Sequence, residues 1–260
     1  MTSPLKANGG DESVALVMDL HGYNLCAAES AQYSGWTRTA AEAGFIVVWP
    51  QGNVNANYSN DPSWDFGPCC ASLGESPLVS EDTDSLSLPP PADLDDADFL
   101  RQVAANIVAS AAMEGVTVDT NRLYFAGHSN GCMMAQAMDA LQSDLVAAVC
   151  CHASGLLVEP SPDTYRPTSV QVVYGDLDTT LDFFFQAKDH ILNTWGEING
   201  CDTGREGDDN NTTTMYRPTT IVGDSGLYAT HTLSNCSDNT VVQTVEVYNV
   251  CHFSYLGVAR

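Results

Sequence analysis

The sequence predicts an α/β fold with a doubly wound, mostly parallel sheet flanked by helices, and three observations lead to this prediction. Short apolar runs that read as buried strands alternate with longer stretches in which apolar residues recur at helical spacing. The chain has 260 residues, enough to bury one sizeable core. Near its middle, a strand-like run passes through a glycine-flanked serine directly into a helix-like run. We therefore expect residues 1–260 to form a single domain.

The first half of the chain predicts strand, helix and strand, an order that implies parallel strands. Residues 14–20 form an apolar strand run, residues 30–43 read as a helix, and residues 44–49 form the next strand. Residues 53–93 are rich in Asn, Ser, Pro and Gly and predict a long irregular loop that lines a cleft. Residues 93–115 predict a helix that begins with acidic residues, as the helix dipole favours.

The second half of the chain continues the alternation of strands and helices. A strand that ends near residue 127 enters the central helix, and later apolar runs predict further core strands. Two alternating stretches near the carboxyl end are typical of strands close to a sheet edge. The predicted strands lie at residues 145–151, 169–174, 228–233 and 241–250, with a helix at 183–199.

The motif Gly127-His-Ser-Asn-Gly131 has the GxSxG pattern of a nucleophile elbow in its strand–turn–helix context. The flanking glycines let the strand and the helix approach closely, and the turn exposes the Ser129 hydroxyl. We expect Ser129 to be a catalytic nucleophile. The backbone N–H of Asn130, at the start of the helix, is the expected first donor of an oxyanion hole.

An acid and a histidine are expected to follow the serine in that order. The segment Tyr174-Gly-Asp-Leu-Asp178 follows a predicted strand, and we choose Asp178 as the acid, with Asp176 and Asp182 as alternatives. His252 follows the last predicted strand directly, so we expect it to be the base.

Three other histidines have positions that favour packing or solvation. His128 lies inside the elbow, His190 in a predicted helix and His231 within a predicted strand. The order of serine, acid and histidine therefore specifies an α/β-hydrolase fold with Ser129, Asp178 and His252 as its catalytic residues.

A second oxyanion donor is expected from a loop that follows the first strand. The segment Asp19-Leu-His-Gly-Tyr-Asn24 is such a loop, and its glycine permits a sharp turn. We expect the N–H of Tyr23 to act together with that of Asn130. The alternative is an ordinary turn at the end of a strand.

Composition narrows the partners of the protein. With 33 acidic and 9 basic residues, the formal net charge is −24, which argues against nucleic acid and anionic membranes and favours neutral esters. No apolar run approaches the length of a membrane span. Nine cysteines without a paired CxxC pattern predict disulfides in a secreted protein rather than a metal site. We expect a secreted monomer without a metal or organic cofactor.

Several motifs together resemble the polyhydroxybutyrate depolymerase and feruloyl esterase family of carboxylesterases. They are Asp19-Leu-His-Gly-Tyr23, Val48-Trp-Pro-Gln-Gly52, Ser63-Trp64 with Cys69-Cys70, Asp95-Asp-Ala-Asp-Phe-Leu100 and the elbow. The resemblance implies a secreted, cofactor-free serine esterase that acts on aryl, acetyl or polyester bonds. It also implies that Cys201 and Cys236 are paired.

The sequence departs from the family at Cys132, where a second glycine usually follows the elbow, and at Cys251, just before the histidine. Two cysteines beside two catalytic residues suggest a Cys132–Cys251 disulfide. The alternative is that both are small buried residues.

Aromatic residues near these motifs are candidate walls of the substrate site. We expect His21, Trp64, Phe66 and Phe253 to bind substrate, with Tyr23 as a further wall. The alternative is that they belong to the core. The sequence predicts a serine carboxylester hydrolase, with feruloyl or other aryl esters ahead of acetylxylan and polyesters. The substrate would be a plant or algal polysaccharide ester, an aryl ester or a polyester, and the non-enzymatic alternative is a binding module on the same fold.

Overall fold

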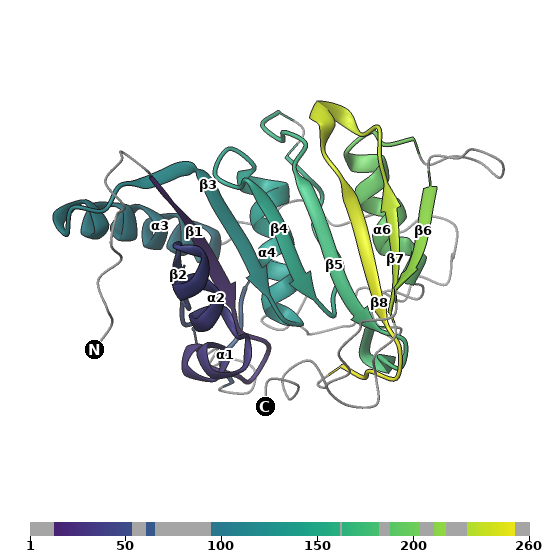
Figure 1. Cartoon of the computed structure of the whole chain (residues 1–260), viewed down its shortest axis with the longest axis horizontal. Coiled ribbons are helices and arrows are strands. Elements are labelled where there is room, and N and C mark those ends of the chain that lie inside the picture. Colours follow the sequence, from purple (N-terminus) through teal and green to yellow (C-terminus); the bar gives the residue numbers. More distant parts are fainter. Residues whose placement is uncertain are drawn as a thin grey trace.

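One mixed sheet organises the part of the chain that the structure describes, which is residues 13–53, 61–65, 95–161, 163–181, 188–202, 211–216 and 228–252. In this computed structural model the strand order is β2-β1-β3-β4-β5-β8-β7-β6 (Figure 1). The strands are β1 Val14–Leu20, β2 Ile46–Val48, β3 Val118–Gly127, β4 Ala148–His152, β5 Ser169–Gly175, β6 Asn211–Tyr216, β7 Tyr228–Leu233 and β8 Val242–Val247. Pairing is parallel from β2 through β8, and β7 is antiparallel to both β8 and β6.

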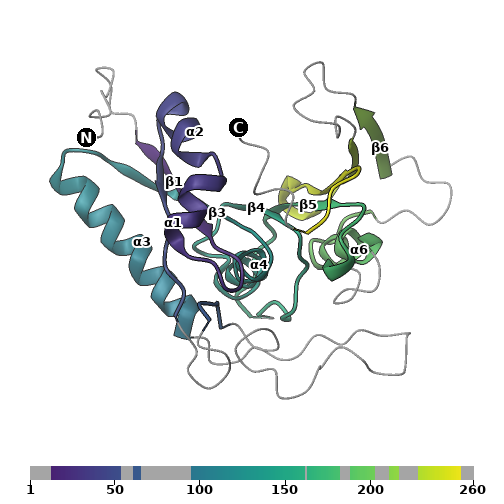
Figure 2. The same cartoon turned by 90° about the horizontal axis from the view of Figure 1, so that it is seen from below.

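Helices cover both faces of this sheet, as the doubly wound prediction requires. They are α1 Ala27–Tyr33, α2 Trp36–Ala43, α3 Asp95–Met113, α4 Asn130–Gln142 and α6 Lys188–Ile198, with a short 3₁₀ turn η1 at Ser237–Asn239. Helix α2 lies on one face, while α3, α4 and α6 lie on the other (Figure 2). The predicted α/β-hydrolase architecture is therefore confirmed, with all of its parallel strands ending on the same side of the molecule (Figure 1).

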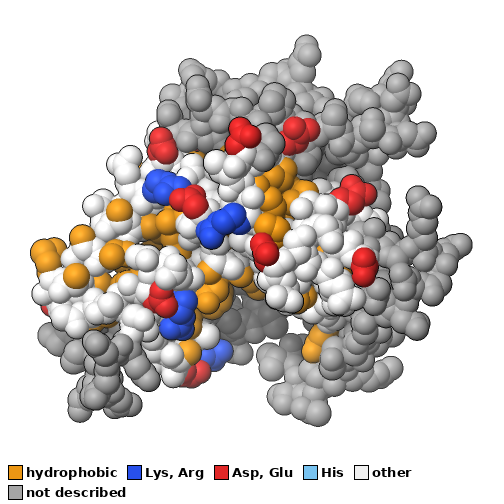
Figure 3. Space-filling model, turned by 90° about the horizontal axis from the view of Figure 1, so that it is seen from above, with side chains coloured by type: hydrophobic (Ala, Val, Ile, Leu, Met, Phe, Trp, Pro, Cys, Tyr) orange, Lys and Arg blue, Asp and Glu red, His pale blue; other side chains and the backbone are white. Residues whose placement is uncertain are grey.

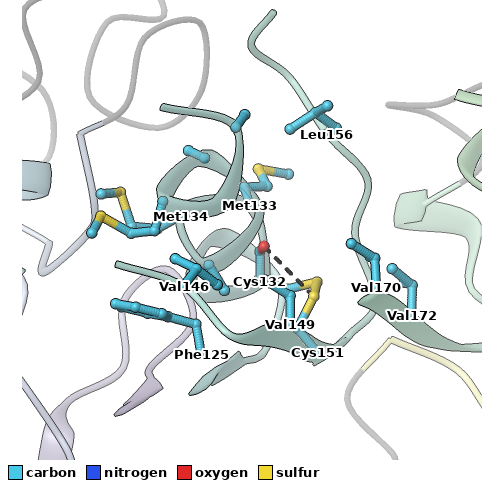
Figure 4. Close-up of a cluster of buried hydrophobic side chains, with 14 of the residues drawn as sticks. Phe125, Cys132, Met133, Met134, Val146, Val149, Cys151, Leu156, Val170 and Val172 are labelled. Atoms are coloured by element: carbon cyan, nitrogen blue, oxygen red, sulfur yellow. Dashed lines mark hydrogen bonds between the residues drawn. A yellow bond between two sulfur atoms is a disulfide. The ribbon is translucent and has the colours of Figure 1, made fainter. Parts of the chain in front are cut away.

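The core is densest around α4, whose residues 130–140 are all buried. Met133 and Met134 from this helix pack in a cluster with Phe125, Val149 and Val170 from three neighbouring strands (Figure 4). Because α4 begins immediately after Ser129, this packing fixes the helix on which the serine depends.

Two local predictions differ from the structure. The helix expected over residues 30–43 is two helices, α1 and α2, because Gly35 adopts a φ of 75°, which interrupts helical geometry. Strand β6 was not predicted, since its sequence NTTTMY lacks an apolar run. The loop expected over residues 53–93 lies mostly outside the described residues.

Charged side chains of both signs lie close together at the end of the molecule where the parallel strands begin (Figure 3). Arg101 on α3, for example, forms an ion pair with Asp144 at 2.9 Å. Both side chains are well exposed, so the pair adds little to stability. Among the elements described, no helix combines the length and the apolar character needed to cross a membrane.

Candidate active site

Ser129 lies at the turn between β3 and α4, in a strained backbone conformation. Its φ is 53° and its ψ is −118°, a combination that non-glycine residues rarely adopt and that costs about 1–3 kcal/mol. The backbone N–H of Ser129 donates to the carbonyl of His152 at 2.9 Å, which ties the turn to the end of β4. The turn therefore presents the Ser129 hydroxyl at the carboxyl end of the sheet.

The flanking glycines are required by space. A Cβ on Gly131 would lie 2.1 Å from the carbonyl oxygen of Leu20, and one on Gly127 would lie 2.6 Å from the backbone of Gly131. No side chain fits in either position. The elbow can therefore pack directly against the loop that follows β1.

His252 connects Ser129 with Asp178 through hydrogen bonds. The His252 Nε2 lies 2.8 Å from the Ser129 Oγ, and its Nδ1 lies 2.9 Å and 3.0 Å from the two carboxyl oxygens of Asp178. The structure thus brings together the three residues chosen from the sequence. The hydroxyl can donate to Nε2 while Nδ1–H donates to the carboxyl group, which is the arrangement that activates a serine.

Strand ends position both partners of Ser129. Asp178 follows β5 and is fully buried, and its Oδ1 accepts a hydrogen bond from the N–H of Leu181 at 2.9 Å. The alternative acid Asp176 instead accepts the N–H of Val250 at 3.3 Å, so it supports the loop before His252. Asp182, the other alternative, lies outside the described residues.

His128 packs behind His252. Its Nε2–H donates to the carbonyl oxygen of His252 at 2.8 Å, and the two rings lie 5.1 Å apart. Burial lowers the pKa of His128 to about 4, which keeps the ring neutral beside His252. Of the other histidines, His231 lies within β7, and the side chain of His190 lies outside the described residues.

The two expected oxyanion donors come from different segments, one inside the elbow and one in the loop after β1. Asn130 is the first residue of α4, so its N–H has no acceptor within the helix. Tyr23 lies in the loop after β1, and its hydroxyl donates to Asp61 at 2.9 Å. An oxyanion hole requires two such N–H groups to converge on a carbonyl oxygen beside the serine.

Two of the aromatic residues expected to bind substrate are instead fully buried. The Nε2 of His21 accepts the N–H of Gly52 at 2.9 Å, and burial lowers the pKa of His21. Trp64 donates its indole N–H to the carbonyl of His21 at 2.9 Å. A side chain without exposed surface cannot line a cleft, so the prediction for these two is wrong, and the core alternative holds. Phe66 and Phe253 lie outside the described residues.

The suggested Cys132–Cys251 disulfide is also wrong. Cys132 on α4 is bonded to Cys151 on β4, and the bond is buried in the core (Figure 4). Cys151 points to the face of the sheet that α4 covers, whereas Cys251 is exposed in the loop before His252. Cys201 is bonded to Cys236, as the resemblance implies.

Two contacts that hold the site were not predicted from the sequence. The side chain of Asn130 and the backbone of Trp64 form hydrogen bonds in both directions, and His128 binds the backbone of His252. Both involve residues inside the elbow motif whose side chains were interpreted as packing or left unassigned. Only the His-Ser-Asn identity of the elbow could have pointed to them.

Comparison with known proteins supports the fold. An acetyl xylan esterase from Aspergillus awamori superposes with a TM-score of 0.56 at 17% identity, covering 95% of this chain and 90% of that one. The chain has the α/β-hydrolase fold. SOBER1 from Arabidopsis thaliana superposes with a TM-score of 0.52 at 12% identity, covering 92% and 91% of the two chains. No model of a known protein family matches the sequence, and no curated protein matches it.

Proposed function

We propose that the protein is a serine carboxylester hydrolase in which Ser129 is the nucleophile, His252 the general base and acid, and Asp178 the group that orients His252. One observation carries the proposal, namely the unbroken hydrogen-bonded series from Asp178 through His252 to the Ser129 hydroxyl. Its three members follow β5, β8 and β3, so separate elements of a rigid sheet hold them.

Acylation begins when the Ser129 Oγ attacks the ester carbonyl carbon and its proton moves to the Nε2 of His252. The carbonyl π electrons move to the oxygen, and the N–H groups of Tyr23 and Asn130 bind the resulting oxyanion. The oxyanion collapses, the bond to the leaving alcohol breaks, and His252 returns the proton to that alcohol. Water then attacks the acyl-serine by the same route and releases the acid.

Aryl esters such as ferulates are the proposed substrate class, and the resemblance of the motifs to feruloyl esterases supports this choice. Acetylxylan is the second candidate, because a fungal acetyl xylan esterase shares the fold over nearly the whole chain. Polyesters are the third. A net charge of −24 favours uncharged substrates, and the two disulfides between described residues are consistent with a secreted protein. We further propose that it acts as a monomer without cofactors.

The test compares release of ferulate from methyl ferulate with hydrolysis of p-nitrophenyl acetate, for the wild type and for Ser129→Ala. We expect both activities in the wild type and neither in the variant. If the wild type hydrolyses only p-nitrophenyl acetate, the proposed substrate class changes from aryl esters to esters of small acyl groups. A wild type that cleaves neither ester would overturn the proposal and favour a binding module.

A further inference from the structure

The segment Asp61–Asp65 contacts the loop that follows β1 at three points. The indole N–H of Trp64 donates to the carbonyl of His21 at 2.9 Å, and the carbonyl of Pro62 accepts the N–H of Asn24 at 2.9 Å. The hydroxyl of Tyr23 donates to Asp61, as described above. The segment therefore holds the loop on both sides of the Tyr23 N–H.

The same segment also binds the residue that carries the other donor. The backbone N–H of Trp64 donates to the Asn130 Oδ1 at 2.7 Å, and the Asn130 Nδ2 donates back to the Trp64 carbonyl at 3.2 Å. Both residues are fully buried. An amide that bonds a backbone in both directions has little freedom to rotate, so the start of α4 is held in position relative to Trp64.

Close packing behind the segment keeps it from moving away from the elbow. A Cβ on Gly52 would lie 2.5 Å from the carbonyl oxygen of Ser63, and the N–H of Ser63 donates to the carbonyl of Asn53 at 3.0 Å. The N–H of Gly52 donates in turn to the buried imidazole of His21. These contacts form a closed ring. It runs from Trp64 to His21, from His21 to Gly52, and from Gly52 through Ser63 back to Trp64.

We propose that Trp64 is a positioning residue that sets the distance between the two halves of the oxyanion hole. One fully buried side chain binds the loop that carries Tyr23, while its own backbone binds the side chain of Asn130. The proposal rests on the proposed esterase function. It gives the Asn130 side chain a role separate from that of its backbone N–H.

The expected effect follows from the geometry that oxyanion stabilisation requires. Donors must lie about 2.7–3.1 Å from the developing oxyanion, and a misplacement of about 1 Å costs roughly 10²-fold in rate. Trp64→Phe removes the indole N–H that binds His21 and leaves the backbone bonds to Asn130 intact. We expect kcat to fall about 10- to 100-fold, with KM within about twofold, because the donors act mainly in the transition state.

Trp195→Phe is the matched control. Trp195 is also fully buried on α6 and also donates one indole hydrogen bond, at 2.7 Å, but its acceptor Gln136 lies on α4 six residues beyond Asn130. Both variants lose a buried indole donor and similar volume, so we expect similar losses of thermal stability. Only Trp64→Phe should lower kcat.

The experiment measures p-nitrophenyl acetate hydrolysis and inhibition by phenylboronic acid, whose boron becomes tetrahedral when it bonds to a catalytic serine. For Trp64→Phe we expect the Ki of the boronic acid to rise in parallel with the fall in kcat. In Trp195→Phe both values should stay within about threefold of wild type. Trp64→Phe with unchanged kcat and Ki in an active enzyme would overturn the inference and leave Trp64 as a packing residue.

A second variant keeps the test decisive if Trp64→Phe fails to fold. Asn130→Ala retains the backbone donor and removes both side-chain bonds to Trp64, and we expect kcat to fall at least tenfold. Where both variants fold, the double variant should lose less than the product of the two single losses, since each change breaks one end of the same link through Trp64. Independent losses, or an unchanged Asn130→Ala, would contradict the inference. A wild type that lacks esterase activity would instead refute the proposed function, and the inference with it.

Discussion

Replacement of Asp178 by Asn should disable the site while leaving its shape intact. The Oδ1 of Asp178 accepts the N–H of Leu181 at 2.9 Å, and Oδ2 lies 2.9 Å from the Nδ1 of His252. An asparagine has one oxygen, and the Leu181 N–H will hold it at the Oδ1 position. The amide NH₂ then takes the Oδ2 position 2.9 Å from Nδ1, nearer than the oxygen at 3.0 Å, and an N–H facing Nδ1 at that distance requires Nδ1 to be an acceptor. His252 would carry its proton on Nε2 and could no longer take one from Ser129.

The wrong tautomer of His252 determines how far kcat falls in Asp178→Asn. In serine hydrolases, this substitution reduces kcat by about 10⁴-fold, which corresponds to about 5.4 kcal/mol at about 1.36 kcal/mol per tenfold change. Asp178 is fully buried and cannot contact the substrate, so KM should change little. The loss should therefore appear in kcat and in kcat/KM to the same extent.

Hydrolysis of p-nitrophenyl acetate by Asp178→Asn and by Asp176→Asn tests this reasoning. The Asp176 Oδ1 accepts a long hydrogen bond from the N–H of Val250, at 3.3 Å, and an asparagine oxygen can accept it equally well. We expect Asp176→Asn to keep kcat within about threefold of wild type, since a side-chain acceptor remains. A loss below tenfold in Asp178→Asn, or equal losses in the two variants, would refute the assignment of the acid.

Two further predictions concern buried titratable groups. In His128→Gln the amide nitrogen can reach the position of Nε2 and still donate to the His252 carbonyl, whereas the shorter side chain of His128→Asn cannot. We therefore expect kcat to fall about tenfold in His128→Asn and to stay near the wild-type value in His128→Gln. Burial raises the pKa of Asp139 to about 7. The folded state therefore binds the Asp139 proton more tightly than the unfolded state does. As a result, the free energy of unfolding falls as pH rises from about 4 to about 7. This fall amounts to at most about 1.4 kcal/mol per pH unit, and Asp139→Asn should remove it. Urea titrations at several pH values measure it, and parallel plots of unfolding free energy against pH for the two proteins would contradict the prediction.

The meeting of Ser129, Asp178 and His252 could be predicted because it depends on chain order and strand ends. Ser129 and Asp178 follow apolar runs and His252 follows an alternating stretch, and all three segments form parallel strands. Parallel strands bring their carboxyl ends to one edge, so residues 74 and 123 positions from His252 meet there. The strand pattern, together with the elbow motif and the order of serine, acid and histidine, therefore carries enough information to bring these three side chains together.

Contacts that depend on which way a side chain points could not be predicted. Trp64 reads as a cleft aromatic, but its ring lies against His21 inside the molecule, with ring centres 5.1 Å apart. Cys132 pairs with Cys151 because α4 covers the face of β4 to which Cys151 points, and a lone strand run does not reveal that face. The break at Gly35 similarly depends on one backbone angle.

Labelling of the wild type with a fluorophosphonate, followed by peptide mass spectrometry, tests the central claim most directly, because only an activated serine reacts with this probe. The account predicts one adduct per chain, located on Ser129, with labelling slowed at least a hundredfold in His252→Ala. An unlabelled protein, or an adduct on any other residue, would contradict the account.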